Sequence, residues 1–177
     1  MLLAKLDKYK IGLRTIKTTL AVFFCLAVQL IFSVDQMHIF YAAIAAIVCM
    51  RETAKESLLI GVHRFIGTLI GGIIGFILIN IITYIPYYHD GMYLIILPLF
   101  IMLGISICVW LKKRNAVIIC CVVVLGIALD PNLNMDNTLW YIILRIFYTT
   151  IGIIITTLLN NYFFPNIEEE TFEDLKV

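Results

Sequence analysis

The sequence predicts an all-α polytopic membrane protein whose six transmembrane helices form a 3+3 inverted repeat. Composition is the first observation behind this fold class, because hydrophobic residues make up 62% of the 177 residues and charged residues only 14%. A soluble domain has about 45–50% apolar and about 25% charged residues. The second observation is that six apolar segments take up nearly all of the chain. The third is a stripe of one arginine and several small residues that occurs twice.

The six predicted segments are separated by short turns and by basic links. The second and the fifth hold 14 residues each, fewer than the roughly 20 that cross the hydrocarbon core. Pro98 is expected to kink the fourth segment. Residues 1–165 are therefore predicted to be one transmembrane module with repeats at 15–84 and 92–164, followed by an acidic cytoplasmic tail at 166–177. The segments run from about Thr15 to Phe32, Met37 to Met50, Leu58 to Tyr84, Met92 to Leu111, Ala116 to Leu129 and Leu139 to Phe164.

Positively charged residues predict how the segments are oriented. Of the 13 lysines and arginines, all but one lie in the N-terminal flank, in or beside the links after the second and fourth segments, or in the tail. The opposite loops hold none. Since Lys and Arg gather on the cytoplasmic side, both termini are predicted to be cytoplasmic. The protein itself is predicted to lie in the cell membrane. The polar link at 51–57 is expected to be helical. The remaining basic residue is Arg145, inside the sixth segment.

The small-residue stripe begins at Arg64 in the third segment and again at Arg145 in the sixth, 81 positions later. On a helix, at about 100° per residue, its members fall on one side. Because three crossings reverse the direction in which the next half enters, the second copy is predicted to be inverted. Inverted repeats with short helices are typical of transporters with a central binding site. The first copy holds Arg64, Gly67, Thr68, Gly71 and Gly75 and extends to Asn80. The second holds Arg145, Thr149, Gly152 and Thr156 and extends to Asn161.

Arg145 is the main candidate for a functional residue. An arginine inside a membrane span costs roughly 2.5–3.5 kcal/mol on insertion scales, so its presence requires an explanation. Either it attracts an anion in a cavity, or its side chain snorkels outward or pairs with Asp136 or Asp130. Arg64 has two explanations as well, since it is either a second cation of the same path or an ordinary charge flanking a span.

The remaining candidate residues, in the stripes and at the ends of the segments, have further explanations. Thr68 and Thr149 are candidates for donating hydroxyl hydrogen bonds to a carboxylate, although threonines also bond to carbonyls of their own helix. Lys17, at the inner end of the first segment, is a candidate anion ligand or a positive-inside anchor. Asn160 is explained by hydrogen bonding near the membrane surface. Four glycines are assigned to close helix packing: Gly67, Gly71, Gly75 and Gly152.

The sequence contains no pattern typical of an enzyme or a metal site. It has no phosphate-binding glycine loop followed by Lys-Ser/Thr, no His/Glu metal set and no nucleophile with a base. The five cysteines lack zinc-ligand spacing and are expected to be buried free thiols. We therefore expect no enzymatic activity, no cofactor and no nucleic-acid partner.

Three stretches carry a resemblance to a known family: GLRTIKTTLAVFF (12–24), HRFIGTLIGGIIG (63–75) and NNYFFP (160–165). Over about residues 10–165 the chain resembles the aromatic acid exporter family, which belongs to the fusaric-acid-resistance-like superfamily. The resemblance implies a six-span module of the bacterial cytoplasmic membrane that exports carboxylated, often aromatic, compounds. More distant relatives, the plant malate-conducting channels, imply a dimer with basic residues along its pore. By motif, the positions concerned are Arg64, Thr68 and Gly71.

These observations lead to one main hypothesis and one alternative. The main hypothesis is a transporter or channel for small organic anions that forms a homodimer or another homo-oligomer. In it, Arg145 and Arg64 attract the carboxylate. The alternative is a non-transporting membrane scaffold whose glycine stripes serve helix packing and oligomerisation. Many members of the family continue into a cytoplasmic helical domain, whereas this sequence ends 12 residues after Pro165.

Overall fold

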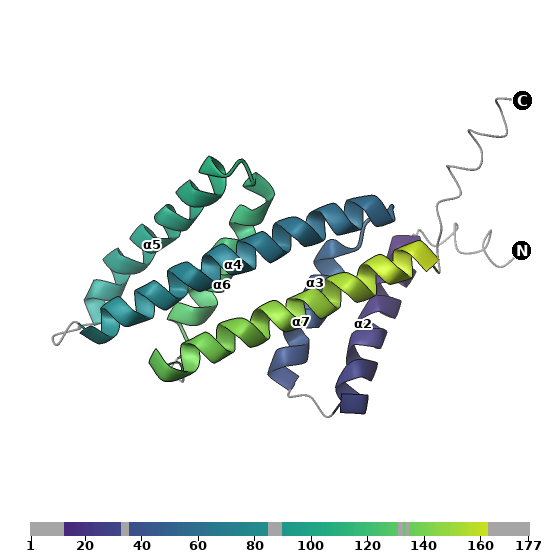
Figure 1. Ribbon diagram of the computed structural model, residues 1–177, viewed down its shortest axis with the longest axis horizontal. Helices are drawn as coiled ribbons and strands as arrows, with labels where there is room; N and C mark the ends of the chain where they lie inside the picture. Colours follow the sequence, from purple (N-terminus) through teal and green to yellow (C-terminus); the bar gives the residue numbers. More distant parts are fainter. Residues whose placement is uncertain (1–12, 33–35, 85–89, 131–132, 134, 163–177) are drawn as a thin grey trace, which may run out of the picture. The chain divides into compact units, whose positions relative to one another are not determined.

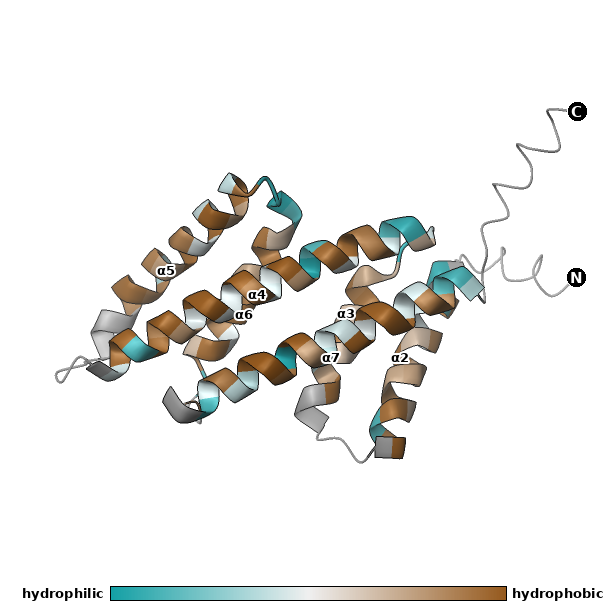
Figure 2. Cartoon of the chain, in the orientation of Figure 1, coloured by the Kyte–Doolittle hydropathy of each residue, from teal (hydrophilic) through white to brown (hydrophobic). Residues whose placement is uncertain are grey.

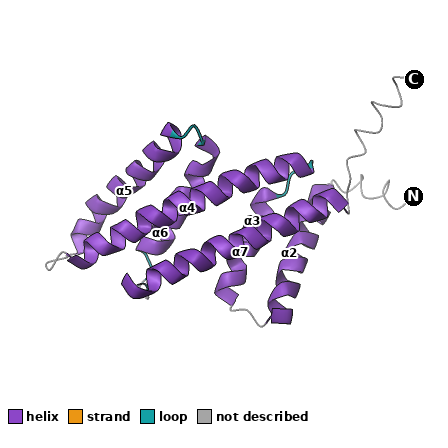
Figure 3. Ribbon diagram, viewed as in Figure 1, coloured by secondary structure: helices purple, strands orange, loops and turns teal. Residues whose placement is uncertain are grey.

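The computed structural model describes residues 13–32, 36–84, 90–130, 133 and 135–162 (Figure 1). The basic flank before residue 13 and the acidic tail at 166–177 lie outside these ranges. Within them, all regular structure is helical, which confirms the predicted all-α class (Figure 3). Each predicted segment coincides with one helix. The helices are α2 (Leu13–Phe32), α3 (Gln36–Cys49), α4 (Ala54–Tyr84), α5 (Asp90–Trp110), α6 (Val117–Ala128) and α7 (Met135–Tyr162), with a 3₁₀ turn, η2 (Arg114–Ala116), before α6.

The start of α4 differs from the expectation that the whole polar link at 51–57 is helical. The helix begins at Ala54, because the Thr53 hydroxyl oxygen accepts a hydrogen bond from the backbone N–H of Glu56 at 3.1 Å. Thr and Glu three residues apart have the spacing of a capping box, which satisfies backbone donors at a helix start. The second half of the link therefore extends α4, and the first half is its cap.

Three of the described helices are long and apolar enough to cross a membrane: Arg14–Ile31 of α2, Ala54–Thr83 of α4 and Asn137–Tyr162 of α7. The apolar parts of α3, α5 and α6 are shorter. Figure 2 shows hydrophobic residues along every helix. The short second and fifth segments are thus confirmed as short helices, and the number of six crossings stays a prediction. Pro98 lies inside α5. The cysteines are free and four of the five are buried, as expected.

The chain divides into two compact units. Unit 1 consists of Met1–Gly61 and Tyr148–Val177, and unit 2 of Val62–Phe147. Both α4 and α7 therefore contribute one part to each unit.

In unit 1, α3 packs against the C-terminal half of α7. A Cβ atom at Gly152 would overlap the carbonyl oxygen of Ala42 and lie 2.8 Å from Cβ of Ala45. One turn further on, the Thr156 hydroxyl donates a hydrogen bond to the carbonyl oxygen of Ala46 at 3.2 Å. Residue numbers rise together along both helices, so α3 and α7 run parallel. The buried core of this unit contains Ala21, Cys25, Ile39, Ala42, Ala46, Met50 and Leu159.

In unit 2, α6 packs against α4 in a corresponding way. Cβ atoms at Gly67, Gly71 and Gly75 would lie 2.6 Å from the Ala116 carbonyl oxygen, 2.7 Å from the Cys120 carbonyl oxygen and 2.6 Å from Cδ1 of Ile127. The contacts again advance together, so α4 and α6 run parallel over about two turns. Buried residues here form two clusters: Ile74, Leu78, Cys108, Ala116, Cys120, Val124 and Ala128, and Ile79, Val123, Ile127 and Ile142.

The two units share one packing scheme. In each, a short helix from one half of the sequence lies on the small-residue stripe of a long helix from the other half. The glycines allow the backbones to approach closely, because any side chain there would occupy the space of a neighbouring backbone atom or side chain. This close approach explains why the stripes of α4 and α7 recur in the sequence.

Candidate functional site

Arg145 lies in α7, within unit 2, and only 8% of its surface is exposed. Its Nη1 donates a hydrogen bond of 2.8 Å to the hydroxyl oxygen of Tyr141, one turn earlier on the same helix. The guanidinium carbon also lies 5.8 Å from the centre of the Tyr141 ring, within the range of a cation–π contact. The side chain is therefore buried in the protein and does not extend into solvent.

Gly126 of α6 makes room for this guanidinium. A Cβ atom at Gly126 would lie 2.8 Å from Nη1 of Arg145, closer than unbonded carbon and nitrogen atoms pack. Gly126 and Tyr141 thus set the position of the charge between α6 and α7. A guanidinium offers five N–H donors in a planar fork that matches a carboxylate. The buried position of Arg145 is suited to holding a carboxylate out of bulk water.

Arg64 and Thr68 lie one turn apart on α4, in unit 2, and both are buried. The Thr68 hydroxyl donates to the carbonyl oxygen of Arg64 at 3.0 Å, which is the simpler of the two explanations for this threonine. Thr149 and Lys17 are buried as well, but both belong to unit 1. The five predicted site residues are therefore divided between the units, with Arg145, Arg64 and Thr68 in unit 2.

Lys17 is the centre of a buried hydrogen-bond network in unit 1. Only 5% of its surface is exposed, and its ammonium donates to Oδ1 of Asn160 at 2.7 Å and to the Glu52 carbonyl at 3.4 Å. Asn160 donates in turn to the Arg51 carbonyl at 2.9 Å and to the Ser57 hydroxyl at 3.0 Å. The network joins α2, the link before α4, the first turns of α4 and the end of α7.

Sequence reasoning did not find Asn160 and Ser57 as members of a site. The extension of the stripe to Asn161 was wrong by one residue, because the spacing of Gly152 and Thr156 also continues to Asn160 one turn later. Asn160 is buried, whereas its neighbour Asn161 is exposed. Ser57 has no such signal, since a serine in the first turn of a helix is common at any surface.

We expect replacement of Asn160 by alanine to destabilise the protein by about 2–4 kcal/mol, because it leaves the buried Lys17 ammonium and Ser57 hydroxyl short of a partner. Asn161→Ala is the matched control, and at an exposed position it should change stability by less than about 0.5 kcal/mol. Unfolding in mixed micelles titrated with a denaturing detergent measures both. Equal effects of the two substitutions would show that the network contributes nothing to stability.

Comparison with protein families gives a match over most of the chain. The family described as Aromatic acid exporter family member 1 matches residues 9–163, the region that contains every described helix. No curated protein and no solved structure matched. The match confirms the resemblance seen in the sequence, and families of exporters move small molecules across membranes rather than convert them. The chain belongs to the aromatic acid exporter family.

Proposed function

We propose that the protein is a membrane transporter or channel for small organic anions, and that it exports aromatic or other small carboxylates. The observation that carries the proposal is the buried guanidinium of Arg145, held by Tyr141 in an apolar helix. Buried charge is costly in a membrane and is typical of substrate and ion pathways. The family's printed description, aromatic acid exporter, supports the same substrate class.

In this proposal Arg145 binds the carboxylate and Tyr141 fixes the angle of the guanidinium. Arg64 and Lys17 are further cations along the path, and Thr149 is a hydroxyl donor to the passing anion. Thr68 has a smaller part, because its hydroxyl already donates a hydrogen bond to the carbonyl oxygen of Arg64. An aromatic carboxylate also needs apolar walls, which the helices supply.

We propose six crossings in the cell membrane, two inverted halves and cytoplasmic termini. With alternating crossings, the second and sixth helices run in one direction and the third and fifth in the other. The packing agrees with these directions, because α3 runs parallel to α7 and α4 runs parallel to α6. The corresponding use of glycine stripes in the two units supports the internal repeat.

The alternative of a non-transporting scaffold receives less support. Its oligomerisation would need the glycine stripes to face another chain, but Gly67, Gly71, Gly75 and Gly152 are buried against helices of the same chain. A homodimer, which we retain as part of the proposal, would form through other faces of the helices.

Efflux from vesicles tests the function directly. Vesicles containing the purified protein and loaded with benzoate should release it faster than protein-free vesicles. Benzamide, which has the same ring but no charge, is the matched substrate control and should show no protein-dependent release. If no aromatic or aliphatic carboxylate moves under any gradient, the proposed function is wrong and the scaffold becomes the better explanation.

Tyr141→Phe tests the positioning of Arg145. The substitution keeps the ring beside the guanidinium and removes only the hydroxyl oxygen that accepts its hydrogen bond. We expect the carboxylate concentration at half-maximal flux to rise about 3- to 10-fold. This is less than the factor of about 12 or more that a hydrogen bond to a charged group, worth roughly 1.5–3 kcal/mol, would give, because the cation–π contact still holds the guanidinium. Tyr162→Phe, at an exposed tyrosine of the same helix, should leave that concentration unchanged.

A further inference from the structure

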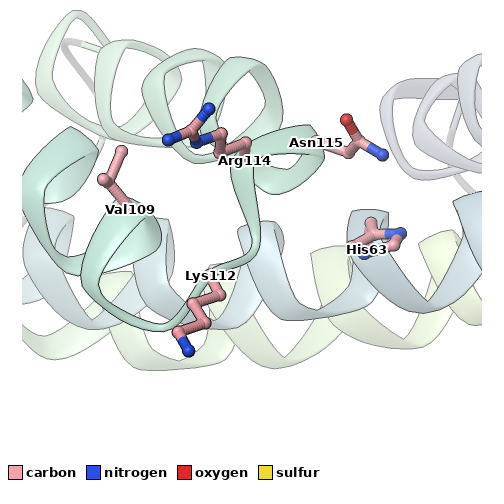
Figure 4. A pocket seen from close by; sticks show the side chains of 5 residues that line it. All are labelled: His63, Val109, Lys112, Arg114 and Asn115. Carbon is pink, nitrogen blue, oxygen red and sulfur yellow. The ribbon is translucent and has the colours of Figure 1, made fainter.

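A pocket of about 410 Å³ opens in unit 2 where the chain turns from α5 into α6 (Figure 4). Val109 belongs to the last turn of α5, and Lys112, Arg114 and Asn115 lie on the connecting segment. His63 reaches the same pocket from α4. Three separate segments therefore build the pocket, and no part of the transport site proposed above lines it.

The chemistry of the lining favours an anion. Lys112 and Arg114 are basic residues, and Asn115 and His63 add hydrogen-bond donors. None of the described residues that line the pocket is acidic. Figure 4 shows the Lys112 and Arg114 side chains leaving the connecting segment in opposite directions, so the two charges attract an anion at the pocket from different sides. Arginine and lysine together are typical ligands of phosphate groups.

The backbone places Lys112 at a position that usually belongs to glycine. Its φ is 58°, in the left-handed region, where a Cβ atom is unfavourable. The N–H of Lys112 bonds to the Val109 carbonyl and that of Lys113 to the Cys108 carbonyl, both at 2.9 Å. These two bonds form the Schellman ending of a helix, in which glycine is the common residue. The chain thus keeps an ammonium at the pocket where stability alone favours glycine.

The surroundings of the pocket identify the source of the anion. Just before Lys112 stand Val109, Trp110 and Leu111, all exposed, and Trp110 is 82% exposed. Exposed tryptophan next to lysine at the end of an apolar helix is typical of the interface between lipid and water. We therefore expect the pocket to open at the level of the lipid headgroups. Basic pockets between helices at that level bind anionic headgroups.

We propose that this pocket binds the phosphate group of an anionic phospholipid, with Lys112 and Arg114 as its charged ligands. The site is separate from carboxylate transport and does not depend on it. A bound lipid would hold the α5–α6 connection against α4 through His63.

Trp110 provides a probe for the test, because the chain has only two tryptophans. In a Trp140→Phe background, fluorescence of Trp110 reports on the lipids in contact with it. The full chain is placed in bilayers that contain phosphatidylglycerol or phosphatidylcholine with brominated acyl chains, which quench tryptophan on contact. We expect stronger quenching by the anionic lipid at equal mole fraction. Equal quenching by the two lipids would overturn the proposal.

Substitutions then assign the preference to the pocket. Lys112→Gln with Arg114→Gln should lower the apparent affinity for the anionic lipid about 10- to 30-fold, since each basic residue near the surface contributes a factor of about 5. Lys55→Gln with Lys113→Gln makes the same change in net charge outside the pocket and should keep the preference. If this control pair loses as much as the pocket pair, general surface charge explains the binding and the proposed site is wrong.

Two further measurements separate the remaining explanations. Lys112→Gly removes the ammonium and relieves the left-handed backbone, so the melting temperature should not fall while lipid affinity drops about 5-fold. A preserved lipid preference in this folded variant would contradict the role of Lys112. Millimolar inorganic phosphate should not displace the lipid. Displacement would identify the ligand as free phosphate and overturn the lipid as its source.

Discussion

Vesicles containing Arg145→Gln protein should release aromatic carboxylate at less than about one thirtieth of the wild-type rate. Removing one partner of a buried, hydrogen-bonded charge pair costs roughly 2–5 kcal/mol, which corresponds to a factor of about 30 to several thousand. Glutamine still reaches the same region but carries no charge for the carboxylate. The measurement is initial efflux at matched protein density, with assembly checked by size-exclusion chromatography.

Two companion variants sharpen this result. Arg145→Lys retains the charge and loses the planar fork that matches a carboxylate, so its flux should lie between those of the wild type and the glutamine variant. Arg14→Gln makes the same chemical change at an exposed position of α2 and should transport normally. Wild-type flux through the Arg145→Gln protein would remove Arg145 from the path, whatever the substrate of the protein proves to be.

Substitution of Gly71 or Gly152 by leucine should prevent recovery of the folded protein. A leucine at Gly71 would enter the space of the Cys120 carbonyl and of Val123, and one at Gly152 that of the Ala42 carbonyl. Backbone atoms of a packed helix cannot rotate away, so the helices must separate. We expect a loss of more than about 4 kcal/mol in each case, which is at the extreme of single substitutions. The yield of monodisperse protein in mild detergent measures it.

Alanine substitutions test the same contacts more gently. Alanine gains about 1 kcal/mol over glycine in a helix, but overpacking costs about 1–3 kcal/mol or more, so Gly71→Ala and Gly152→Ala should be destabilising overall. Gly104→Ala is the control, because its Cβ would meet only the flexible ends of Cys120 and Ile74 at 3.1 and 3.3 Å. It should be neutral or stabilising. If all three variants behave alike, close backbone approach is not what the stripes provide.

The helices could be predicted from the sequence because each apolar run is bounded by turn-forming or charged residues. Their contacts could be predicted only in part. The stripe that begins at Arg64 indicated where a helix would pack. It did not reveal that α6 fills the stripe of α4, or that α3, from the other half of the sequence, fills that of α7. Local patterns specify a face, whereas the partner of that face depends on the whole chain.

The candidate site shows the same limit at the level of single side chains. Arg145 could be singled out because a charge in an apolar helix is costly in itself. Its neighbour Gly126 carried no signal, since a glycine in a helix has meaning only once the side chain opposite it is known. The bond between Lys17 and Asn160 joins residues 143 positions apart. Such a pair becomes visible only after three segments have met.

The exchange of short helices between the halves also implies an order of assembly. Unit 2 is one continuous stretch, Val62–Phe147, so α6 meets its partner α4 as soon as both have been synthesised. Unit 1 is discontinuous, and α3 has to wait for α7, the last of the described helices, before its alanine face is covered. Until the second half of α7 arrives, the Lys17 ammonium also lacks Asn160. Arrival of the second half of α7 is therefore the event that completes unit 1, because it covers α3 and supplies the partner of Lys17.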